Sequence, residues 1–408
     1  MVLQLATITQ EIDATIAISG SKSESNRLLI LQQLIPGLQI ENLSDSDDSN
    51  HLQHALHTDD TLIDIGHAGT AMRFLTAFFA VKEGREVVLT GSERMQQRPI
   101  EILVNALQDL GAQISYEAKT GYPPIRIIGR KILQKSVQVN GNVSSQYISA
   151  LMLIGAILEQ GLEIELLGEV TSVPYINMTL RLLHELGINA SFEGCSIAVN
   201  HFSKPVQKNI IVESDWSSAS YFYSCIALSD LNSKVTLSSY KKESLQGDSC
   251  LAEIYQHFGV ETSFEDNSMT LTKARTTRTD CLQLDLKDAP DIAQTIAVTC
   301  FGLGISCELK GLHTLKIKET DRLVALKNEL TKLGGDLHIT NHSLSLKEAT
   351  AMAKDIAIET YNDHRMAMAF TPLALKTSIV ILDAEVVTKS FRNFWDAMQQ
   401  IGFQITEA

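Results

Sequence analysis

The sequence has few cysteines, few basic residues and no long apolar run, and each shortage excludes a class of protein. Its six cysteines are scattered along 408 residues without a C-x-x-C pair, so we expect buried thiols in a reducing compartment and no metal site. No stretch approaches the length of a membrane span, and the first residues lack the basic start and apolar stretch of a secretory signal. We therefore expect a cytoplasmic protein with no membrane partner.

The shortage of positive charge excludes another class of partner. Asp and Glu number 48 against 34 Lys and Arg, which gives a formal net charge of −14. Nucleic acids bind basic surfaces, so we expect no nucleic-acid partner. The sequence also lacks G-x-x-x-x-G-K-[ST] and G-x-G-x-x-G motifs, and with them the usual signals for nucleotides and dinucleotides. In such an acidic chain, a local group of Lys and Arg indicates a small anionic ligand.

A repeated pattern runs through the whole sequence. Six times a β-prone stretch leads into a polar or glycine-containing turn and then an apolar helix, with a spacing of roughly 75 residues from the second copy onward. These helices are expected to begin near residues 21, 68, 144, 217, 290 and 363. Because they are apolar nearly all round, we expect them to be buried. Six such α/β units favour two domains of three units each.

A second, amphipathic helix follows each apolar helix and is expected to cover it. Five of these helices should stop at a glycine in the left-handed conformation, namely Gly111, Gly187, Gly259, Gly334 and Gly402. The sixth segment, residues 48–57, has no such glycine. It carries His51, His54 and His57 at helical spacing, which we interpret as a solvated helix face rather than a metal site.

Polar and charged residues open the buried helices: Lys22, Arg27, Arg73, Ser144, Ser145, Gln146, Asp291, His364 and Arg365. Helix N-termini carry unpaired N–H groups and a partial positive charge, so cations there are unfavourable unless an anion is supplied. Taken alone, Ser144 is more simply a helix cap. Four basic residues at helix starts in an acidic chain nevertheless favour an anion-binding site.

A further run of charge lies just before an amphipathic helix. Lys318, Glu319, Asp321 and Arg322 fall within five positions, after what looks like a strand. A mixed run of this kind is usually a solvated helix start. The basic residues at the other helix starts favour the alternative, in which these charges gather around an anion.

Nine motifs together resemble one enzyme family, because they occur in the order of that family's signatures. They are SGSKSESNR (19–27), IGHAGTAMR (65–73), QRPI (97–100), GNVSSQYISAL (141–151), SVPYINMT (172–179), APDIAQT (289–295), KETDR (318–322), NDHRMAM (362–368) and TKSF (388–391). The family is that of the EPSP synthases, the 3-phosphoshikimate 1-carboxyvinyltransferases. The resemblance covers the chain from Ser19 to Phe391.

The resemblance implies a fold that the repeat alone does not define. It implies a two-domain inside-out α/β barrel, with three βαβαββ repeats in each domain and the active site in the cleft between them. The first domain, on the shikimate-3-phosphate side, is expected at residues 21–213. The second is expected to be discontinuous, at 1–20 and 214–408, and to carry the KETDR and NDHR motifs.

The resemblance also implies a reaction. The 5-hydroxyl of shikimate-3-phosphate attacks C2 of phosphoenolpyruvate while C3 gains a proton, and phosphate is then lost. The expected catalytic residues are Lys22, Asp291 and Glu319. Asp291 is expected to take the hydroxyl proton, Glu319 to deliver and later remove the proton at C3, and Lys22 to stabilise charge. No metal or organic cofactor is expected, and family precedent favours a monomer.

The binding residues follow from the same motifs. The residues expected to bind shikimate-3-phosphate are Lys22, Ser23, Arg27, Ser144, Ser145, Gln146, Ser172, Tyr175, Asp291 and Lys318. Those expected to bind phosphoenolpyruvate are Lys22, Gly69, Arg98, Gln146, Arg322, Arg365 and Lys389. In addition, Arg73 is expected to support the glycine loop, and Asp321 to be a helix-start residue. The inhibitor glyphosate is expected to compete with phosphoenolpyruvate, because Gly69 has no side chain to exclude it.

Four positions depart from the family pattern. His67 stands where Asn is usual, Phe74 where many members have Pro, Val173 where Lys is common, and Thr314 where some have Asn. Phe74 could shift Gly69 and weaken inhibition by glyphosate. Two alternatives remain. One is the related transferase that acts on UDP-N-acetylglucosamine, although no cysteine precedes Cys195 as a reactive loop cysteine would. The other is a non-catalytic, anion-binding homologue.

Overall fold

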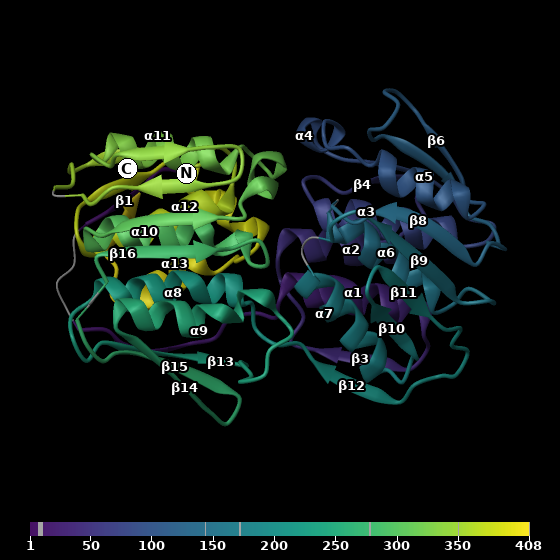
Figure 1. Ribbon diagram of the computed structural model, residues 1–408, viewed down its shortest axis with the longest axis horizontal. Coiled ribbons are helices and arrows are strands. Elements are labelled where there is room, and N and C mark those ends of the chain that lie inside the picture. The colour runs from purple at the N-terminus through teal and green to yellow at the C-terminus, as the bar shows by residue number, and fades with distance from the viewer. Residues whose placement is uncertain (7–10, 143, 171–172, 277–278, 350, 408) are drawn as a thin grey trace. The chain divides into compact units, whose positions relative to one another are not determined.

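The chain forms two compact units, seen here in a computed structural model (Figure 1). One unit comprises Gly20–Val212, and the other comprises Met1–Ser19 together with Glu213–Ala408. The structure describes residues 1–6, 11–142, 144–170, 173–276, 279–349 and 351–407. No helix in these ranges is both long enough and apolar enough to cross a bilayer.

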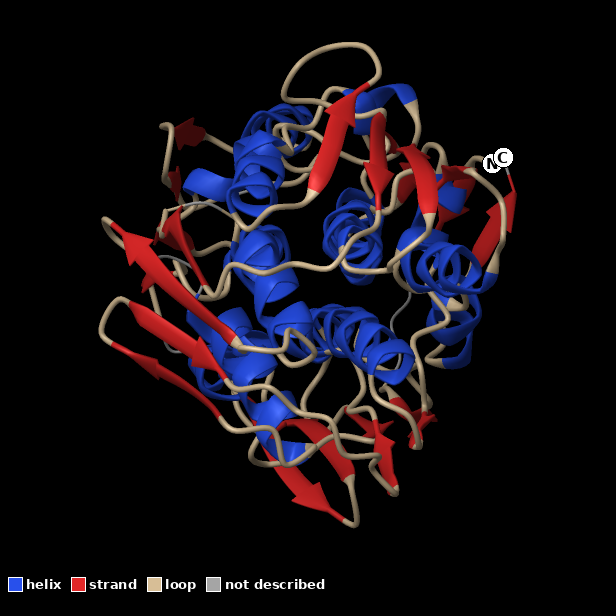
Figure 2. Cartoon of the chain, turned by 90° about the vertical axis from the view of Figure 1, so that its right-hand side faces the viewer, coloured by secondary structure: helices blue, strands red, loops and turns tan. Residues whose placement is uncertain are grey.

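Helices lie inside each unit and strands lie around the outside (Figure 2). The six apolar helices predicted from the repeat are the inner ones. They are α1 (Lys22–Leu34), α3 (Gly69–Ala80), α6 (Ser145–Gly155), α8 (Trp216–Leu228), α10 (Ala293–Leu303) and α12 (His364–Phe370). Every residue of α3 and α12 is buried, as expected for helices that are apolar on all sides. Their polar first residues are therefore held at fixed positions by the core.

The second helix of each repeat covers the inner one. These helices are α2 (Asp47–His57), α5 (Glu101–Asp109), α7 (Val173–Glu185), α9 (Leu251–Ile254) with the 3-10 helix η2 (Tyr255–Phe258), α11 (Arg322–Lys332) and α13 (Phe394–Gln400). The predicted glycine stops are confirmed, because all five glycines have positive φ, from 78° at Gly259 to 103° at Gly402. The fourth covering helix differs from the prediction, since it is one short α-helical turn followed by a 3-10 helix.

The strands follow one plan in five four-stranded sheets. In the sheet around α10, β16 (Cys281–Asp285) pairs in parallel with β17 (Ser306–Lys310), which pairs antiparallel with β19 (Leu344–Leu346). The hairpin partner β18 (Leu337–Ile339) completes the sheet. Along the chain this is β16–α10–β17–α11–β18–β19, the βαβαββ repeat. The same order occurs in β4 (Leu62–Asp64), β5 (Glu86–Thr90), β6 (Gln113–Tyr116) and β7 (Ile125–Ile128), and in β8 (Ser136–Asn140), β9 (Leu162–Leu167), β10 (Ala190–Glu193) and β11 (Ser196–Val199).

Strands from distant parts of the chain complete the other sheets. In the discontinuous unit, β2 (Asp13–Ile16) pairs in parallel with β13 (Lys234–Ser238), beside the hairpin of β14 (Val260–Glu265) and β15 (Ser268–Lys273). The N-terminal strand β1 (Leu3–Leu5) lies between β21 (Ile379–Ile381) and β22 (Ile405–Glu407), and β20 (Ile356–Ile358) adds the fourth strand. The unit therefore needs both ends of the chain.

One repeat is shorter than the expected βαβαββ unit. In the unit Gly20–Val212, β3 (Leu38–Glu41) pairs only with β12 (Lys208–Ile211), in a two-stranded parallel sheet. The reason is the connection after α2, because α2 ends at His57 and β4 begins at Leu62. This interval is too short for a hairpin, so the expectation of three complete repeats in this unit was wrong in this detail.

The cysteines also correct an expectation. Cys225, Cys300 and Cys307 are buried, as predicted, but Cys195 and Cys281 are exposed. Cys195 lies in the turn between β10 and β11, and Cys281 begins β16 at the edge of its sheet. Turns and strand ends lie at the surface, which explains why an apolar residue type is exposed there.

A buried lysine gives a test of the packing of the discontinuous unit. Lys273, 5% exposed, donates hydrogen bonds to Ala227 O at 2.6 Å and Phe258 O at 2.7 Å. These carbonyl groups lie at the ends of α8 and η2, where no helical N–H remains to pair with them. We expect Lys273→Met to lower the free energy of unfolding by about 3 kcal/mol, because it leaves two buried acceptors unpaired.

Urea unfolding would measure this change. The matched control is Lys234→Met in the same sheet, because Lys234 forms only an exposed ion pair with Asp13 and should contribute little. If both variants unfold at the same urea concentration, Lys273 does not hold the two helix ends.

Candidate active site

The KETDR motif is organised around the buried guanidinium of Arg322. This residue is 1% exposed, and each of its three nitrogens donates to a different carboxylate. Nε donates to Asp363 Oδ2 at 2.7 Å, Nη1 to Asp291 Oδ1 at 2.9 Å and Nη2 to Glu319 Oε2 at 2.7 Å. Arg322 therefore fixes the two predicted proton-transfer groups, Asp291 and Glu319, next to each other.

Asp321 has the helix-start role that the sequence predicted. It is the N-cap of α11, and its side chain accepts a hydrogen bond from Val324 N at 3.2 Å. Capping places Arg322 at the first position of the helix. The four charges of the motif are thus divided, because Asp321 caps a helix while Lys318, Glu319 and Arg322 belong to the network of ion pairs.

Asp291 is surrounded by cations. It lies in the 3-10 turn η3 (Pro290–Ile292) before α10, and it forms ion pairs with Lys318 Nζ at 3.3 Å and Arg365 Nη2 at 3.4 Å besides the bond from Arg322. Burial alone would raise the pKa of Asp291, but the positive charges of Lys318, Arg365 and Arg322 outweigh burial and hold the pKa well below its usual range. Asp291 is therefore a carboxylate at neutral pH.

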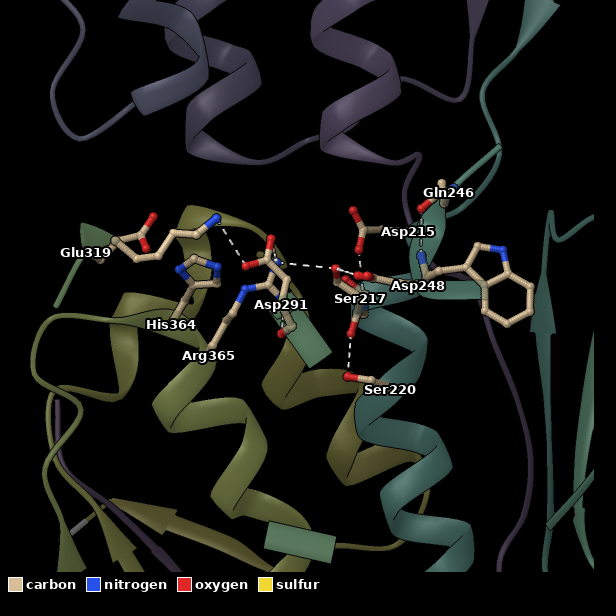
Figure 3. A network of polar contacts seen from close by, with 12 residues as sticks. Asp215, Ser217, Ser220, Gln246, Asp248, Asp291, Glu319, His364 and Arg365 are labelled. Atoms are coloured by element: carbon tan, nitrogen blue, oxygen red, sulfur yellow. Dashed lines mark hydrogen bonds and ion pairs between the residues drawn. The ribbon is translucent and has the colours of Figure 1, made fainter. Parts of the chain in front are cut away.

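The NDHR motif completes the group in this unit. Asp363 caps α12 by accepting from Arg365 N at 2.9 Å, and Arg365 Nη1 donates to Asp291 O at 3.2 Å. Lys389 Nζ donates to both oxygens of Asn362, at 2.6 Å to the carbonyl and 2.9 Å to the side chain. The structure thus joins five of the six site residues predicted in this unit, namely Asp291, Lys318, Glu319, Arg322 and Arg365, of which Figure 3 labels Asp291, Glu319 and Arg365. The sixth, Lys389, contacts Asn362, the residue before Asp363.

Several polar residues of this network were missed by the sequence analysis. Asp363 could have been found, because it lies inside the NDHR motif at a helix start. Ser217 and Asp248 gave no signal, since their Oγ and Oδ2 atoms meet only in the folded chain. Gln246 Oε1 accepts from Trp216 N at 2.9 Å and so holds the loop before Asp248 against the start of α8.

In the other unit, one arginine holds the glycine loop and a second lies against it. Arg73 Nη1 donates to Gly69 O at 3.0 Å and Nη2 to Pro99 O at 3.1 Å, which confirms the prediction that Arg73 supports this loop. A Cβ atom at Gly69 would lie 2.4 Å from Arg98 Nη1. Gly69 and Arg98 are therefore in close contact, and only glycine leaves the guanidinium its present position.

Gln146 joins this group from the start of α6. Its Nε2 donates to Thr70 Oγ1 at 3.2 Å, next to Gly69. Ser144 Oγ accepts from Gln146 N at 3.4 Å, so Ser144 is the cap of the helix, and Ser145 is its buried first residue. Gly69 and Gln146, two of the residues predicted to bind phosphoenolpyruvate, thus lie in the first turns of α3 and α6, and a third, Arg98, lies against Gly69 from the segment before α5.

Arg27 forms a second centre in this unit. It is 2% exposed, and it donates to Thr179 Oγ1 at 2.7 Å, Ser149 Oγ at 2.9 Å, Ser23 O at 2.6 Å and Tyr175 O at 3.3 Å. Burial lowers the pKa of Arg27 to about 10, so the side chain stays charged at neutral pH. Hydrogen bonds to the described residues use four of its five N–H groups.

These contacts bring Ser23, Arg27 and Tyr175 together, with Lys22 one residue earlier at the start of α1. Ser172, the other predicted ligand from this region, lies outside the described residues.

The structure gives the contacts or the burial of three of the four residues that depart from the family pattern. The ring of Phe74 lies 5.4 Å from Arg27 Cζ, a cation–π contact that a proline could not make. His67 Nδ1 is 2.9 Å from Ser92 Oγ. Thr314 Oγ1 is buried without a hydrogen-bond partner among the described residues. Val173 begins α7.

The described part of the chain contains no group of three or more His, Cys, Asp or Glu side chains placed to hold a metal ion. The histidines of α2 have other neighbours. His57 Nδ1 contacts Gln53 O at 2.7 Å and its Nε2 contacts Gln33 Nε2 at 3.2 Å, both in exposed positions.

Comparison with known proteins agrees with the motifs. The sequence profile of the EPSP synthase family, 3-phosphoshikimate 1-carboxyvinyltransferase, matches residues 52–398. The chain is 44% identical to the 3-phosphoshikimate 1-carboxyvinyltransferase of Bacteroides fragilis strain ATCC 25285, over 98% of both chains. It is 34% identical to the enzyme of the same name from Pasteurella multocida strain Pm70, over 96% of both chains.

Solved structures share the fold. EPSP synthase from Acinetobacter baumannii superimposes with a TM-score of 0.82 at 21% identity, over the full length of both chains. The enolpyruvyl transferase NikO from Streptomyces tendae gives a TM-score of 0.77 at 12% identity, over 100% of this chain and 98% of that one. The predicted two-domain α/β fold is therefore confirmed. On the profile match and the full-length identities, this chain belongs to the EPSP synthase family.

Proposed function

We propose that the chain is a 3-phosphoshikimate 1-carboxyvinyltransferase, which transfers the enolpyruvyl group of phosphoenolpyruvate to the 5-hydroxyl of shikimate-3-phosphate and releases phosphate. Beyond family membership, one observation supports this function most strongly. Two carboxylates, Asp291 and Glu319, are bound to the same buried arginine, with Lys318 and Arg365 beside Asp291. Such a group offers proton-transfer residues and anion ligands in one place.

The ligand assignments are part of the proposal. In the unit Gly20–Val212, Lys22, Gly69, Arg98 and Gln146 bind phosphoenolpyruvate, and the residues around Arg27 bind shikimate-3-phosphate together with Ser144, Ser145 and Ser172. This unit is the domain that holds most of shikimate-3-phosphate. The discontinuous unit is the second domain, and it supplies Asp291 and Lys318 to shikimate-3-phosphate and Arg322, Arg365 and Lys389 to phosphoenolpyruvate.

The electrostatics of Asp291 suggest how it becomes a base. When no substrate is bound, Lys318, Arg322 and Arg365 hold the pKa of Asp291 so low that its carboxylate cannot take a proton from an alcohol. Substrate carboxylate and phosphate groups bound to the same cations would share their positive charge. The pKa of Asp291 then rises, because fewer positive charges stabilise its ionised form. Asp291 thus gains basicity only when the anionic substrates are present.

The remaining steps follow the charge that develops. As the C2–O bond forms, Asp291 takes the hydroxyl proton and Glu319 gives a proton to C3, which produces a tetrahedral intermediate. Glu319 then removes a proton from C3 while the C2–O bond to phosphate breaks. Lys22 and the arginines stabilise the departing phosphate, and because they are fixed before the reaction they need little reorganisation.

A phosphate-release assay tests the function. We expect inorganic phosphate only when shikimate-3-phosphate and phosphoenolpyruvate are both present, and none when UDP-N-acetylglucosamine replaces the acceptor. Binding of both anions without phosphate release would instead support a non-catalytic homologue. We also propose that the protein is a cytoplasmic monomer. Light scattering on the purified protein would measure its mass and so test the monomeric state.

The role of Glu319 gives a first prediction. Glu319→Gln keeps an oxygen that can accept from Arg322 Nη2, so substrate binding should be largely retained. Turnover should fall by about 10²-fold or more, because the amide cannot transfer the proton at C3. Steady-state kinetics would measure both quantities. The control is Asp321→Asn, which preserves the helix cap two residues away and should leave turnover close to normal. Near-normal turnover in Glu319→Gln would remove Glu319 from the mechanism.

The contact between Gly69 and Arg98 gives a second prediction. In Gly69→Ala, the new methyl group would displace the Arg98 guanidinium, whose Nη1 would otherwise be 2.4 Å away. We expect KM for phosphoenolpyruvate to rise about tenfold, which corresponds to a loss of about 1.4 kcal/mol, and inhibition by glyphosate to weaken. Arg98→Lys in the same background should add little if the methyl group acts through Arg98.

Inhibition of the unmodified enzyme is the reference for this test. We expect glyphosate to compete with phosphoenolpyruvate. If glyphosate fails to inhibit although phosphoenolpyruvate binds normally, Gly69 is not the deciding contact. Phe74, which packs against Arg27, and His67 in the glycine loop would be the next positions to change.

A further inference from the structure

Asp248 is a buried carboxylate that the proposed reaction does not use. It lies in the 3-10 turn η1 (Gly247–Cys250) and is 4% exposed. Its Oδ2 accepts a hydrogen bond from Ser217 Oγ, while Oδ1 is buried without a hydrogen-bond partner among the described residues. A carboxylate removed from water with one oxygen unpaired is unfavourable for folding. Its presence here therefore calls for a role other than stability.

The hydrogen bonds of Ser217 have a fixed direction. Its hydroxyl carries one hydrogen, which it donates to Asp248. The same oxygen accepts from Arg365 Nη2 at 3.3 Å. Arg365, Ser217 and Asp248 thus form a chain in which every donor points toward the carboxylate (Figure 3). Through Ser217, the negative charge of Asp248 attracts the guanidinium of Arg365.

Arg365 lies between two carboxylates as a result. On one side it reaches Asp248 through Ser217, and on the other its Nη2 lies 3.4 Å from Asp291 Oδ2. Its Nε is buried and has no hydrogen-bond partner among the described residues. Among the described residues, Asp291 is the one carboxylate that forms an ion pair with Arg365. Without the attraction of Asp248, the guanidinium would therefore turn toward Asp291. The unused Nε–H would then move away from its present position.

We propose that Asp248 is a positioning residue, which acts through Ser217 to hold the guanidinium of Arg365 in place for the anion of phosphoenolpyruvate. This inference rests on the proposed function, because it takes Arg365 to be a ligand of that substrate. It adds two residues, Asp248 and Ser217, to which none of the motifs assigns a role. Neither needs to touch the substrate.

The positioning should depend on pH. Burial raises the pKa of Asp248 to about 6. This value includes the effects of the charged groups that face Asp248. Asp291 on η3 and Asp215 at the N-cap of α8 also raise the pKa, while Arg365 on α12 and the hydrogen bond from Ser217 lower it. Below this pH Asp248 is neutral and attracts Arg365 only weakly. The affinity for phosphoenolpyruvate should therefore fall as the pH decreases through about 6.

The experiment compares four variants of the full-length protein: Asp248→Asn, Ser217→Ala, the double variant, and Ser220→Ala as the control. Ser220 is a buried serine one turn further along α8, whose hydroxyl donates to Ser217 O and contacts Thr295 Oγ1 without reaching Arg365. At pH 7.5 we expect Asp248→Asn to raise KM for phosphoenolpyruvate about tenfold with a smaller change in kcat. Ser220→Ala should keep the KM of the unmodified protein.

Two further readouts distinguish positioning from a merely structural role. The phosphate groups of the substrates also titrate near pH 6, so the pH profile of kcat/KM for phosphoenolpyruvate should become shallower there in Asp248→Asn, because position 248 no longer titrates. The double variant should be no worse than the more damaged single variant, since both changes break the same chain. Independent, additive effects would overturn the proposal. So would a normal KM and pH profile in Asp248→Asn, even if its melting temperature falls.

An inactive unmodified protein would count against the proposed function and not against the chain of hydrogen bonds. In that case thermal unfolding tests whether Asp248, Ser217 and Arg365 act as one chain. The folded state holds the Asp248 proton more tightly than the unfolded state between the ordinary pKa of 3.8 and about 6, so this group makes the protein less stable as the pH rises through that interval. The melting temperature of Asp248→Asn minus that of the unmodified protein should therefore increase as the pH is raised from 4 to 6. A difference that does not change with pH, or additive effects of the two single changes on melting temperature, would overturn the inference.

Discussion

The contact of one buried arginine with three carboxylates determines the arrangement of the candidate site. Asp291 precedes α10, Glu319 precedes α11 and Asp363 caps α12, so Arg322 joins the starts of inner and covering helices from different repeats. Breaking a buried ion pair leaves an uncompensated charge and is costly, commonly about 3–5 kcal/mol. The positions of Lys318 and Arg365 depend in turn on Asp291. A change at Arg322 would thus disturb Asp291, Glu319 and Asp363 directly, and Lys318 and Arg365 through Asp291.

The two units stabilise their buried cations by different means. In the discontinuous unit, Arg322 and Arg365 are compensated by carboxylates. In the unit Gly20–Val212, Arg27 is bound by hydroxyl and carbonyl oxygens and an aromatic ring, and Arg73 by carbonyl oxygens, a sulfur atom and a second ring. Glu24 and Asp48 also act on these two arginines, but the contacts named here are neutral, so the positive charge is compensated less than that of Arg322, which favours the binding of an anion there. The proposed assignment of most of shikimate-3-phosphate to this unit agrees with that difference.

Local patterns were enough to predict much of this structure. The apolar helices, their polar starts, the glycine stops and the Asp321 cap follow from periodicity and from capping chemistry, which depend on neighbours in the sequence. The reduced repeat at β3 and the exposure of Cys195 depend on connection length and strand position, which the repeat pattern hides. Ser217 and Asp248 are separated by 31 positions and come together only through tertiary folding, so no spacing rule could pair them.

The position of β1 has a consequence for the order in which the chain can fold during synthesis. The strand Leu3–Leu5 is hydrogen-bonded on one side to Ile379–Ile381 and on the other to Ile405–Glu407. Leu3–Leu5 therefore cannot find its neighbours until residues 379–407, more than 370 positions later, have been translated. Gly20–Val212 is continuous and can fold while the rest is being made. During that time both edges of β1 remain unpaired and can pair with wrong strands, as any exposed strand edge can.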